Sequence, residues 1–233
     1  MKLTSAKGHL KLAEDTPSFT TTLRWKKADN FQLTKRDFES FWGFYWLFKD
    51  FPENDMAENF LYAAFASSNS VKEREKSIEL GEEYLASEKW TKFRADVTFI
   101  MANAYRQEAE NLKQEAVSLQ NEMGTVERDR AEKASIKSEE YYDRFFSICN
   151  QFIEVMPEHK YAKEFVGMMG AVYFKGKKFD QLLEKFAGFE NGQMSKAKGY
   201  VNREEFKKSP AMPTAHYMSG LALLATGKFN ETK

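Results

Sequence analysis

Cysteine is almost absent from this sequence, which has a single one, Cys149, among 233 residues. One cysteine excludes an internal disulfide and every metal site built from several thiolates. Its neighbours Phe145, Ile148 and Phe152 form an apolar helix face in the sequence pattern. Because free cysteines are commonly buried, we expect Cys149 to be a small core residue and not a reactive thiol.

An excess of charge of one sign is missing too. The 35 basic and 35 acidic residues give a formal net charge of zero at pH 7. Binding to a polyanion depends on such an excess, so the composition favours neither nucleic acid nor an anionic membrane surface as a partner. We expect no nucleic-acid partner.

Long apolar runs are missing as well. The first residues lack the apolar stretch of a signal peptide, and the most apolar run, Phe41 to Phe48, is too short to span a bilayer. We therefore expect no membrane insertion and a cytoplasmic location. If a leader was removed ahead of Met1, the alternative is a periplasmic or otherwise exported protein.

Sequence motifs of catalysis are not found. There is no phosphate-binding glycine-lysine loop, no dinucleotide glycine fingerprint, no His-Glu-x-x-His and no Glu-x-x-His pair. The histidines His9, His159 and His216 are far apart, and acidic pairs such as Glu139-Glu140 stand among basic residues, which suits surface ion pairs. We expect no enzyme activity, no cofactor and no metal site in this chain.

Proline is scarce, with five residues, and none lies within residues 57–156 or 158–209. Apolar residues recur at spacings of three and four almost throughout, which predicts α-helices. The only stretch that favours a strand, Thr20 to Trp25, is short and isolated. With 21 phenylalanines available to fill gaps between helices, we expect an all-α fold.

The first part of the chain divides into a lead-in and a helical segment. We expect residues 1–33 to be irregular and residues 34–87 to be helical with a degenerate repeat. Thr34 is a good N-cap for a first helix that ends at Phe51-Pro52, and its aromatic residues on nearly every side predict burial between neighbours. Two further helices, about 55–66 and 70–86, are expected to form a hairpin joined at Ser67-Ser68-Asn69.

The centre of the chain, residues 88–157, predicts a long antiparallel helical hairpin. Apolar residues from Tyr105 to Val126 step alternately by four and three, as in a coiled coil. Gly124-Thr125 offers the end of one helix and the start of the next, so we expect helices over about 90–123 and 126–156. The alternative is one continuous helix, since a glycine inside a helix costs only about 1 kcal/mol. The charged outer part, 106–140, is either a solvated projection or an arm that contacts a partner.

Near the end of the chain, four residue types recur at a fixed spacing. A small residue lets a paired helix approach, an apolar residue fills the interface, a glycine ends the first helix in a left-handed conformation, and an aromatic residue begins the second helix. The two sets are Gly220, Leu223, Gly227 and Phe229, and, with the second glycine one position earlier, Gly170, Tyr173, Gly176 and Phe179.

This pattern resembles the tetratricopeptide repeat family. The resemblance is best from Tyr161 to Lys233 and is degenerate upstream, where Ala102 and Tyr105 match a first helix. It implies a solenoid of helical hairpins, in which 158–233 holds the repeats and the central hairpin is a repeat lengthened by insertion. Leu182 and Phe186 stand where a second helix of the family presents packing residues.

Two departures from the family pattern stand out. Gly170 and Gly220 are 50 residues apart, against the usual repeat of 34, so about 16 extra residues lie between Phe189 and Pro213. We expect a loop there with a short helix over 201–207, and such a loop is a candidate for contact with a partner. The last repeat stops at Lys233 without the helix that would cover 217–225, which suggests a fragment of a longer protein or coverage by another chain.

The resemblance implies a scaffold or adaptor that binds a peptide or a partner domain. Two alternatives stay open: a regulatory or sensing segment of a larger protein, with an enzyme part elsewhere, or a self-assembling scaffold that forms a homo-oligomer. Only Asn103 falls where some members of the family clamp a terminal carboxylate, so we expect no such clamp. The candidate partner-binding residues lie on the first helices of the expected repeats: Phe99, Asn103, Arg106, Val166, Met169 and Tyr173.

Overall fold

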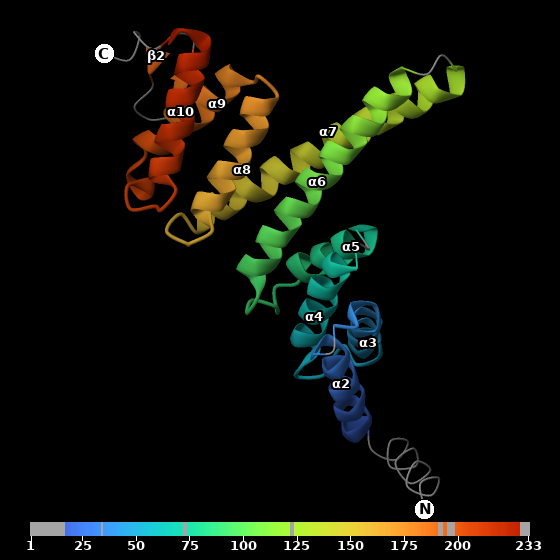
Figure 1. The fold of residues 1–233 in the computed structure, drawn as a ribbon. Helices are drawn as coiled ribbons and strands as arrows, with labels where there is room; N and C mark the ends of the chain where they lie inside the picture. Colours follow the sequence, from blue (N-terminus) through green and yellow to red (C-terminus); the bar gives the residue numbers. More distant parts are fainter. Residues whose placement is uncertain are drawn as a thin grey trace, which may run out of the picture. The chain divides into compact units, whose positions relative to one another are not determined.

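Helices make up nearly all of the structure. The computed structural model describes residues 17–33, 35–71, 74–121, 124–190, 193–194 and 199–228. In this part of the chain the expected all-α fold is confirmed, and the strands are limited to one two-residue antiparallel ladder. The elements, labelled as in Figure 1, are α2 (Pro17–Leu33), α3 (Asp37–Asp50), α4 (Ala57–Ser70), α5 (Arg74–Ala86), α6 (Arg94–Gln120), α7 (Thr125–Val155), α8 (Ala162–Lys175), α9 (Phe179–Ala187), β1 (Phe189–Glu190), β2 (Gln193–Met194), the 3₁₀ helices η1 (Tyr200–Asn202) and η2 (Glu204–Phe206), and α10 (Met212–Thr226).

The chain divides into two compact units, Met1–Ala104 and Tyr105–Lys233, and the boundary falls inside α6. Each unit buries an aromatic core of its own. In the first unit this core includes Phe41, Phe60, Phe65 and Tyr84, and in the second unit Phe145, Phe165, Phe186 and Phe206. Among the described residues, no helix is long and apolar enough to cross a membrane.

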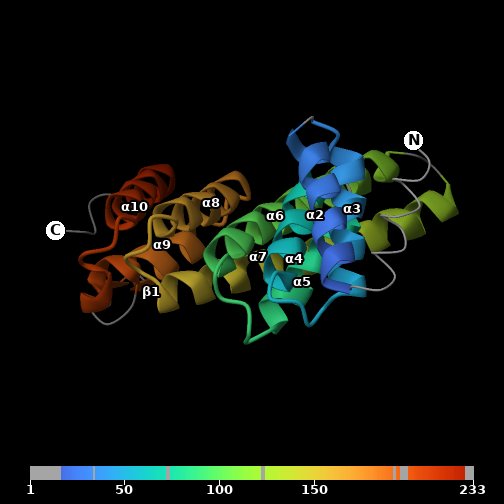
Figure 2. The ribbon, with the colours of Figure 1, turned by 90° about the horizontal axis from the view of Figure 1, so that it is seen from below.

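In the first unit, α3 packs against α2 on one side and α4 on the other, and α4 packs on α5 (Figure 1 and Figure 2). The contact of α2 with α3 depends on Gly43, because a Cβ there would lie only 2.9 Å from the Cβ of Ala28. Such a separation is too short for two carbon atoms, so a glycine lets these helices approach closely.

Three expectations for the first unit meet different outcomes. The prediction that the chain is irregular up to residue 33 is wrong for 17–33, which form α2, while residues 1–16 lie outside the described part.

The turn expected at Ser67 to Asn69 is also wrong, because α4 continues to Ser70. The Ser68 hydroxyl donates a hydrogen bond to the Phe65 carbonyl oxygen at 2.6 Å, which satisfies this buried group within the helix. Thr34, the expected N-cap, lies outside the described residues, and α3 begins at Asp37.

In the second unit, α7 returns along α6 as the predicted antiparallel hairpin. Gly124 is the N-cap of α7, so one continuous helix through this glycine is excluded. The Ser138 hydroxyl donates a hydrogen bond to the Ala109 carbonyl oxygen at 2.7 Å, and the rings of Tyr105 and Tyr141 lie 5.9 Å apart. The predicted seam is correct at Tyr105 and Ala109, which are buried, and wrong at Val126, which is 63% exposed.

The helices α8, α9 and α10 follow as a packed group. A Cβ on Gly170 would lie 2.7 Å from the Met218 side chain and 3.3 Å from the Phe186 ring, so this small residue lets α10 approach α8 most closely, whereas the repeat pattern predicted close approach of the paired helix, α9. Leu182 and Phe186 are fully buried, which confirms their expected packing role.

The glycines expected to end helices differ from each other. Gly227 has a φ of 71° and ends α10 in the left-handed conformation, as expected. Gly176 has a φ of −78°, and Lys177, with a φ of 54°, takes the left-handed position after α8. The prediction for Gly176 is therefore wrong by one residue. Residues 229–233, which include the expected start of a last helix, lie outside the described part of the chain.

The extra segment between α9 and α10 contains η1 and η2 where one short helix over 201–207 was expected. Gly199 precedes η1 with a φ of 80°, and a Cβ there would lie 2.2 Å from the backbone nitrogen of Gly188. The Asn202 side chain donates a hydrogen bond to the Ala187 carbonyl oxygen at 2.7 Å, and the Ser209 hydroxyl donates to the Pro157 carbonyl oxygen. This segment is thus fixed against the helices at several points.

Candidate functional site

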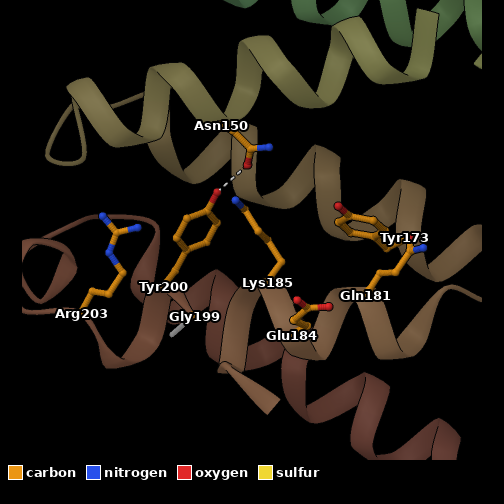
Figure 3. A pocket seen from close by; sticks show the side chains of 8 residues that line it. All are labelled: Asn150, Tyr173, Gln181, Glu184, Lys185, Gly199, Tyr200 and Arg203. Carbon is orange, nitrogen blue, oxygen red and sulfur yellow. Dashed lines mark hydrogen bonds between the residues drawn. The ribbon is translucent and has the colours of Figure 1, made fainter. Parts of the chain in front are cut away.

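A pocket of about 570 Å³ lies in the second unit, where the extra segment faces α7 and α9. Figure 3 shows its lining from close by. Most lining side chains carry hydrogen-bonding or charged groups, and the pocket is open to solvent. The lining residues are Asn150 from α7, Tyr173 from α8, Gln181, Glu184 and Lys185 from α9, and Gly199, Tyr200 and Arg203 from the extra segment.

Tyr200 forms the wall of the pocket that belongs to the extra segment. Its hydroxyl group is hydrogen-bonded to Oδ1 of Asn150 at 2.7 Å, as Figure 3 shows. The ring is buried and stacks on Phe186 with a centroid separation of 5.6 Å. Burial raises the pKa of Tyr200 well above its usual value, so the hydroxyl stays protonated and donates to the Asn150 oxygen.

Arg203 fastens the same segment to α7. Its Nη1 and Nη2 atoms donate to the two carboxylate oxygens of Glu154 at 2.8 and 2.6 Å, and its Nε donates to Glu205 at 2.7 Å. The paired hydrogen bonds to Glu154 raise the pKa of Arg203 further, so its charge is permanent. Two carboxylates neutralise this guanidinium, and its role is to position the wall of the pocket.

Lys185 and Glu184 place opposite charges on α9 at the pocket. The Lys185 ammonium lies 5.3 Å from the centroid of the Tyr200 ring, within the range of a cation–π contact. Burial lowers the pKa of Lys185, and the nearby Glu154 carboxylate partly opposes this effect. The half-buried ammonium can therefore gain from an additional acceptor brought by a ligand.

Tyr173 closes the other side of the pocket. Its ring stacks on Phe146 at 4.6 Å and meets the edge of Phe186 at 6.4 Å. Burial raises the pKa of Tyr173, so its hydroxyl group stays neutral and can donate or accept a hydrogen bond. Together with the amide of Gln181, which is exposed, it offers both donors and acceptors to a ligand.

The described residues show neither a metal-binding cluster nor an exposed thiol. In the described ranges, no group of three or more histidine, cysteine, aspartate or glutamate side chains could hold a metal ion. Cys149 is fully buried, as expected, and burial raises its pKa well above the usual value of a thiol. A thiol in such a setting is a poor nucleophile.

Two of the six residues expected to bind a partner are buried in the structure. Val166 and Met169 are 1% and 0% exposed, so these two side chains belong to the core, and we correct their assignment. Phe99 and Asn103 are half-buried in the first unit, where the Asn103 amide donates to the Phe99 carbonyl oxygen at 3.2 Å. Of the six, only Tyr173 lines the pocket of Figure 3.

Arg106 lines a separate pocket of about 470 Å³ between α6 and α8. Its Nη1 lies 3.2 Å from Oε1 of Glu110, and the same oxygen lies 3.9 Å from the Lys175 ammonium. Arg106 and Lys175 thus both lie near one carboxylate oxygen of Glu110 in this pocket.

Sequence reasoning missed most of the residues that line the pocket. Asn150 and Tyr200 are 50 positions apart, and no motif joins them. The one feature of the sequence that pointed to the pocket is the extra segment, which was predicted as a candidate for contact with a partner. This segment supplies one wall of the pocket.

The chain matches no family model, no curated protein and no solved structure.

Proposed function

We propose that this chain is a protein-interaction scaffold without enzyme activity of its own, and that it holds a peptide segment of a partner protein in the pocket of Figure 3. The observation that carries this proposal is the fixed wall of the pocket. Tyr200, Asn202 and Arg203 tie the extra segment to α7 and to the end of α9. A pre-formed pocket loses little conformational entropy on binding, which favours affinity.

The lining chemistry fits a peptide. A peptide backbone needs donors and acceptors in alternation, and the side chains of Asn150, Gln181 and Tyr173 supply both kinds. Glu184 and Lys185 can pair with charged side chains of either sign. The volume of about 570 Å³ lies within the range of ligand pockets and suits two or three residues of a longer segment.

The helical arrangement gives secondary support. The succession of α8, α9 and α10, with Gly170 at a close helix contact and Leu182 and Phe186 in the core, fits the proposed likeness to tetratricopeptide repeats. Helical repeats stack into extended surfaces that commonly bind proteins. On this proposal the extra segment turns part of such a surface into a specific pocket.

The test is a selection of peptides from a random 12-residue library on the purified 233-residue chain, followed by measurement of affinities by fluorescence anisotropy. Gln181 is exposed at the pocket, so Gln181→Trp should fill the space without disturbing the core. We expect selected peptides to lose about tenfold or more in affinity for this variant, which corresponds to about 1.4 kcal/mol.

Gln114→Trp provides the matched control, because Gln114 is also an exposed glutamine on a helix but does not line the pocket. Its affinity for the same peptides should stay within about twofold of the original chain. A library that yields no binding peptide, or peptides that bind both variants equally, would reject the proposed site.

A further inference from the structure

Lys185 brings a positive charge into the pocket of Figure 3 that the described residues leave without an anionic partner. Its side chain extends from α9 toward Asn150 and the hydroxyl group of Tyr200. Among the described residues the Lys185 ammonium has no ion pair and no hydrogen bond, and its one contact of this kind is with the Tyr200 ring, 5.3 Å from the centroid. Burial lowers the pKa of Lys185, because the ammonium is partly removed from water.

The other charged groups around Lys185 are already engaged or well solvated. Both carboxylate oxygens of Glu154 accept hydrogen bonds from Arg203, whose Nε donates to Glu205. Arg203 is thereby neutralised and does not compete with Lys185 for an anion. The Glu184 carboxylate is exposed, and ion pairs between exposed groups contribute little free energy. Of the charged residues that line the pocket, Lys185 therefore gains most from an oppositely charged group of a ligand.

Asn150 supplies neutral hydrogen-bond donors to the same pocket. The Tyr200 hydroxyl donates to Oδ1 of Asn150 at 2.7 Å, which fixes the orientation of this amide and leaves its NH₂ group as the remaining polar group. No described residue accepts a hydrogen bond from this NH₂ group. A carboxylate only accepts hydrogen bonds, whereas an ammonium and an amide NH₂ group only donate them. The unused groups of Lys185 and Asn150 are therefore complementary to a carboxylate.

A carboxylate fits this pocket better than a phosphate group does. A phosphorylated side chain carries about 1.5 to 2 negative charges, and proteins usually bind it with a cluster of arginines. Among the residues that line the pocket, the guanidinium of Arg203 is bound to two carboxylates, so Lys185 is the one cation left to pair with a ligand. One cation matches a ligand group with a single negative charge.

We propose that the peptide held in this pocket is recognised through an acidic side chain, an aspartate or a glutamate, whose carboxylate accepts hydrogen bonds from the Lys185 ammonium and the Asn150 NH₂ group. This inference rests on the function proposed above and adds the class of residue that the peptide must carry. Lys185 and Asn150 are then the residues that determine specificity. Since the ammonium is half-buried, the ion pair and its hydrogen bonds should raise the affinity about tenfold, more than an exposed pair would.

The first test uses the peptides selected on the full chain, synthesised with an amidated C-terminus so that every carboxylate belongs to a side chain. We expect the selected sequences to share an acidic position. Replacing that residue by its amide, Glu by Gln or Asp by Asn, should weaken binding about tenfold in fluorescence anisotropy. This change leaves the protein untouched, so misfolding cannot explain a loss. Peptides that lose affinity for Gln181→Trp but tolerate neutralisation of every acidic residue would overturn this inference and leave the proposed function standing.

Two variants of the chain test the groups that bind the carboxylate. Lys185→Met removes the charge and keeps a side chain of similar length. Asn150→Asp keeps an oxygen acceptor for the Tyr200 hydroxyl and replaces the NH₂ donors by a second, anionic oxygen. Each variant should weaken binding of the acidic peptide about tenfold. With Lys185→Met, the difference in affinity between the acidic peptide and its amide analogue should fall to about twofold, because the two changes remove the same ion pair. Circular dichroism checks that both variants stay folded.

Lys163→Met is the matched control, because Lys163 is an exposed lysine on α8 that does not line the pocket. It should leave the affinity within about twofold of the original chain. Glu184→Gln separates the inference from its converse, a pocket that selects a basic residue. We expect stronger binding of acidic peptides to Glu184→Gln, because a negative charge is removed near the carboxylate. Weaker binding to Glu184→Gln together with stronger binding to Lys185→Met would overturn the inference, and the absence of any binding peptide would reject the proposed function along with it.

Discussion

Replacing Tyr200 separates the two contributions that hold the extra segment at the pocket, the hydroxyl group and the ring. Tyr200→Phe removes the hydrogen bond to Asn150, whose length is 2.7 Å, and keeps the ring. Tyr200→Ala removes both. The ring is only 3% exposed and lies 5.6 Å from the ring of Phe186 and 5.1 Å from that of Phe206.

The expected magnitudes differ clearly. A hydrogen bond between neutral side chains contributes about 1 kcal/mol to stability. Removing a large buried aromatic ring costs about 3–5 kcal/mol, since the space it leaves is only partly refilled. The segment should therefore open roughly fivefold more often in Tyr200→Phe and more than a hundredfold more often in Tyr200→Ala.

Hydrogen exchange followed by mass spectrometry measures this opening directly. The amide groups of Asn202, Phe206 and Ser209 are hydrogen-bonded within the segment, so their exchange reports its local stability. Tyr217→Ala, at an exposed position on α10, serves as the control and should leave these rates unchanged. Equal protection in the original chain and Tyr200→Ala would refute the argument that the ring holds the wall of the pocket.

Three further predictions concern single side chains. Gly220→Ala should stabilise the chain by about 0.5–1 kcal/mol in urea unfolding, because nothing lies near its added Cβ, whereas Gly170→Ala should destabilise it by about 1 kcal/mol or more through contact with Met218. Cys149, the only cysteine, should react with a thiol-specific disulfide reagent about a hundredfold more slowly in the folded chain than in urea, and fast reaction without denaturant would contradict its burial. Burial lowers the pKa of Lys185 in the folded state, so the unfolded chain binds this proton more tightly, and the contribution of Lys185 to stability should rise with pH up to about 10.4. Lys185→Met should flatten that rise in urea unfolding at a series of pH values, while the exposed Lys163→Met should leave it unchanged.

Much of the helical fold could be predicted because helical periodicity is local in sequence. The reversal near Gly124 was predicted, although this glycine is the N-cap of α7 and not the expected end of α6. The buried positions Leu182 and Phe186 were implied by the resemblance to tetratricopeptide repeats. The helix α2 was missed because its run of threonines favours extended structure. Its contact with α3 at Gly43 contributes stability that local propensity does not show.

The pocket could not be predicted from local sequence patterns. It depends on how the extra segment docks, and this docking rests on pairs of residues that are distant in sequence, such as Arg203 with Glu154 and Tyr200 with Asn150. Many other polar residues in the chain could form similar pairs, so only the structure identifies these two. The pattern of α3 is limited in another way. It predicted burial on nearly every side, but Phe38 and Trp46 are 55% and 51% exposed, because a sequence pattern shows which faces of a helix are apolar and not which of them a neighbour covers.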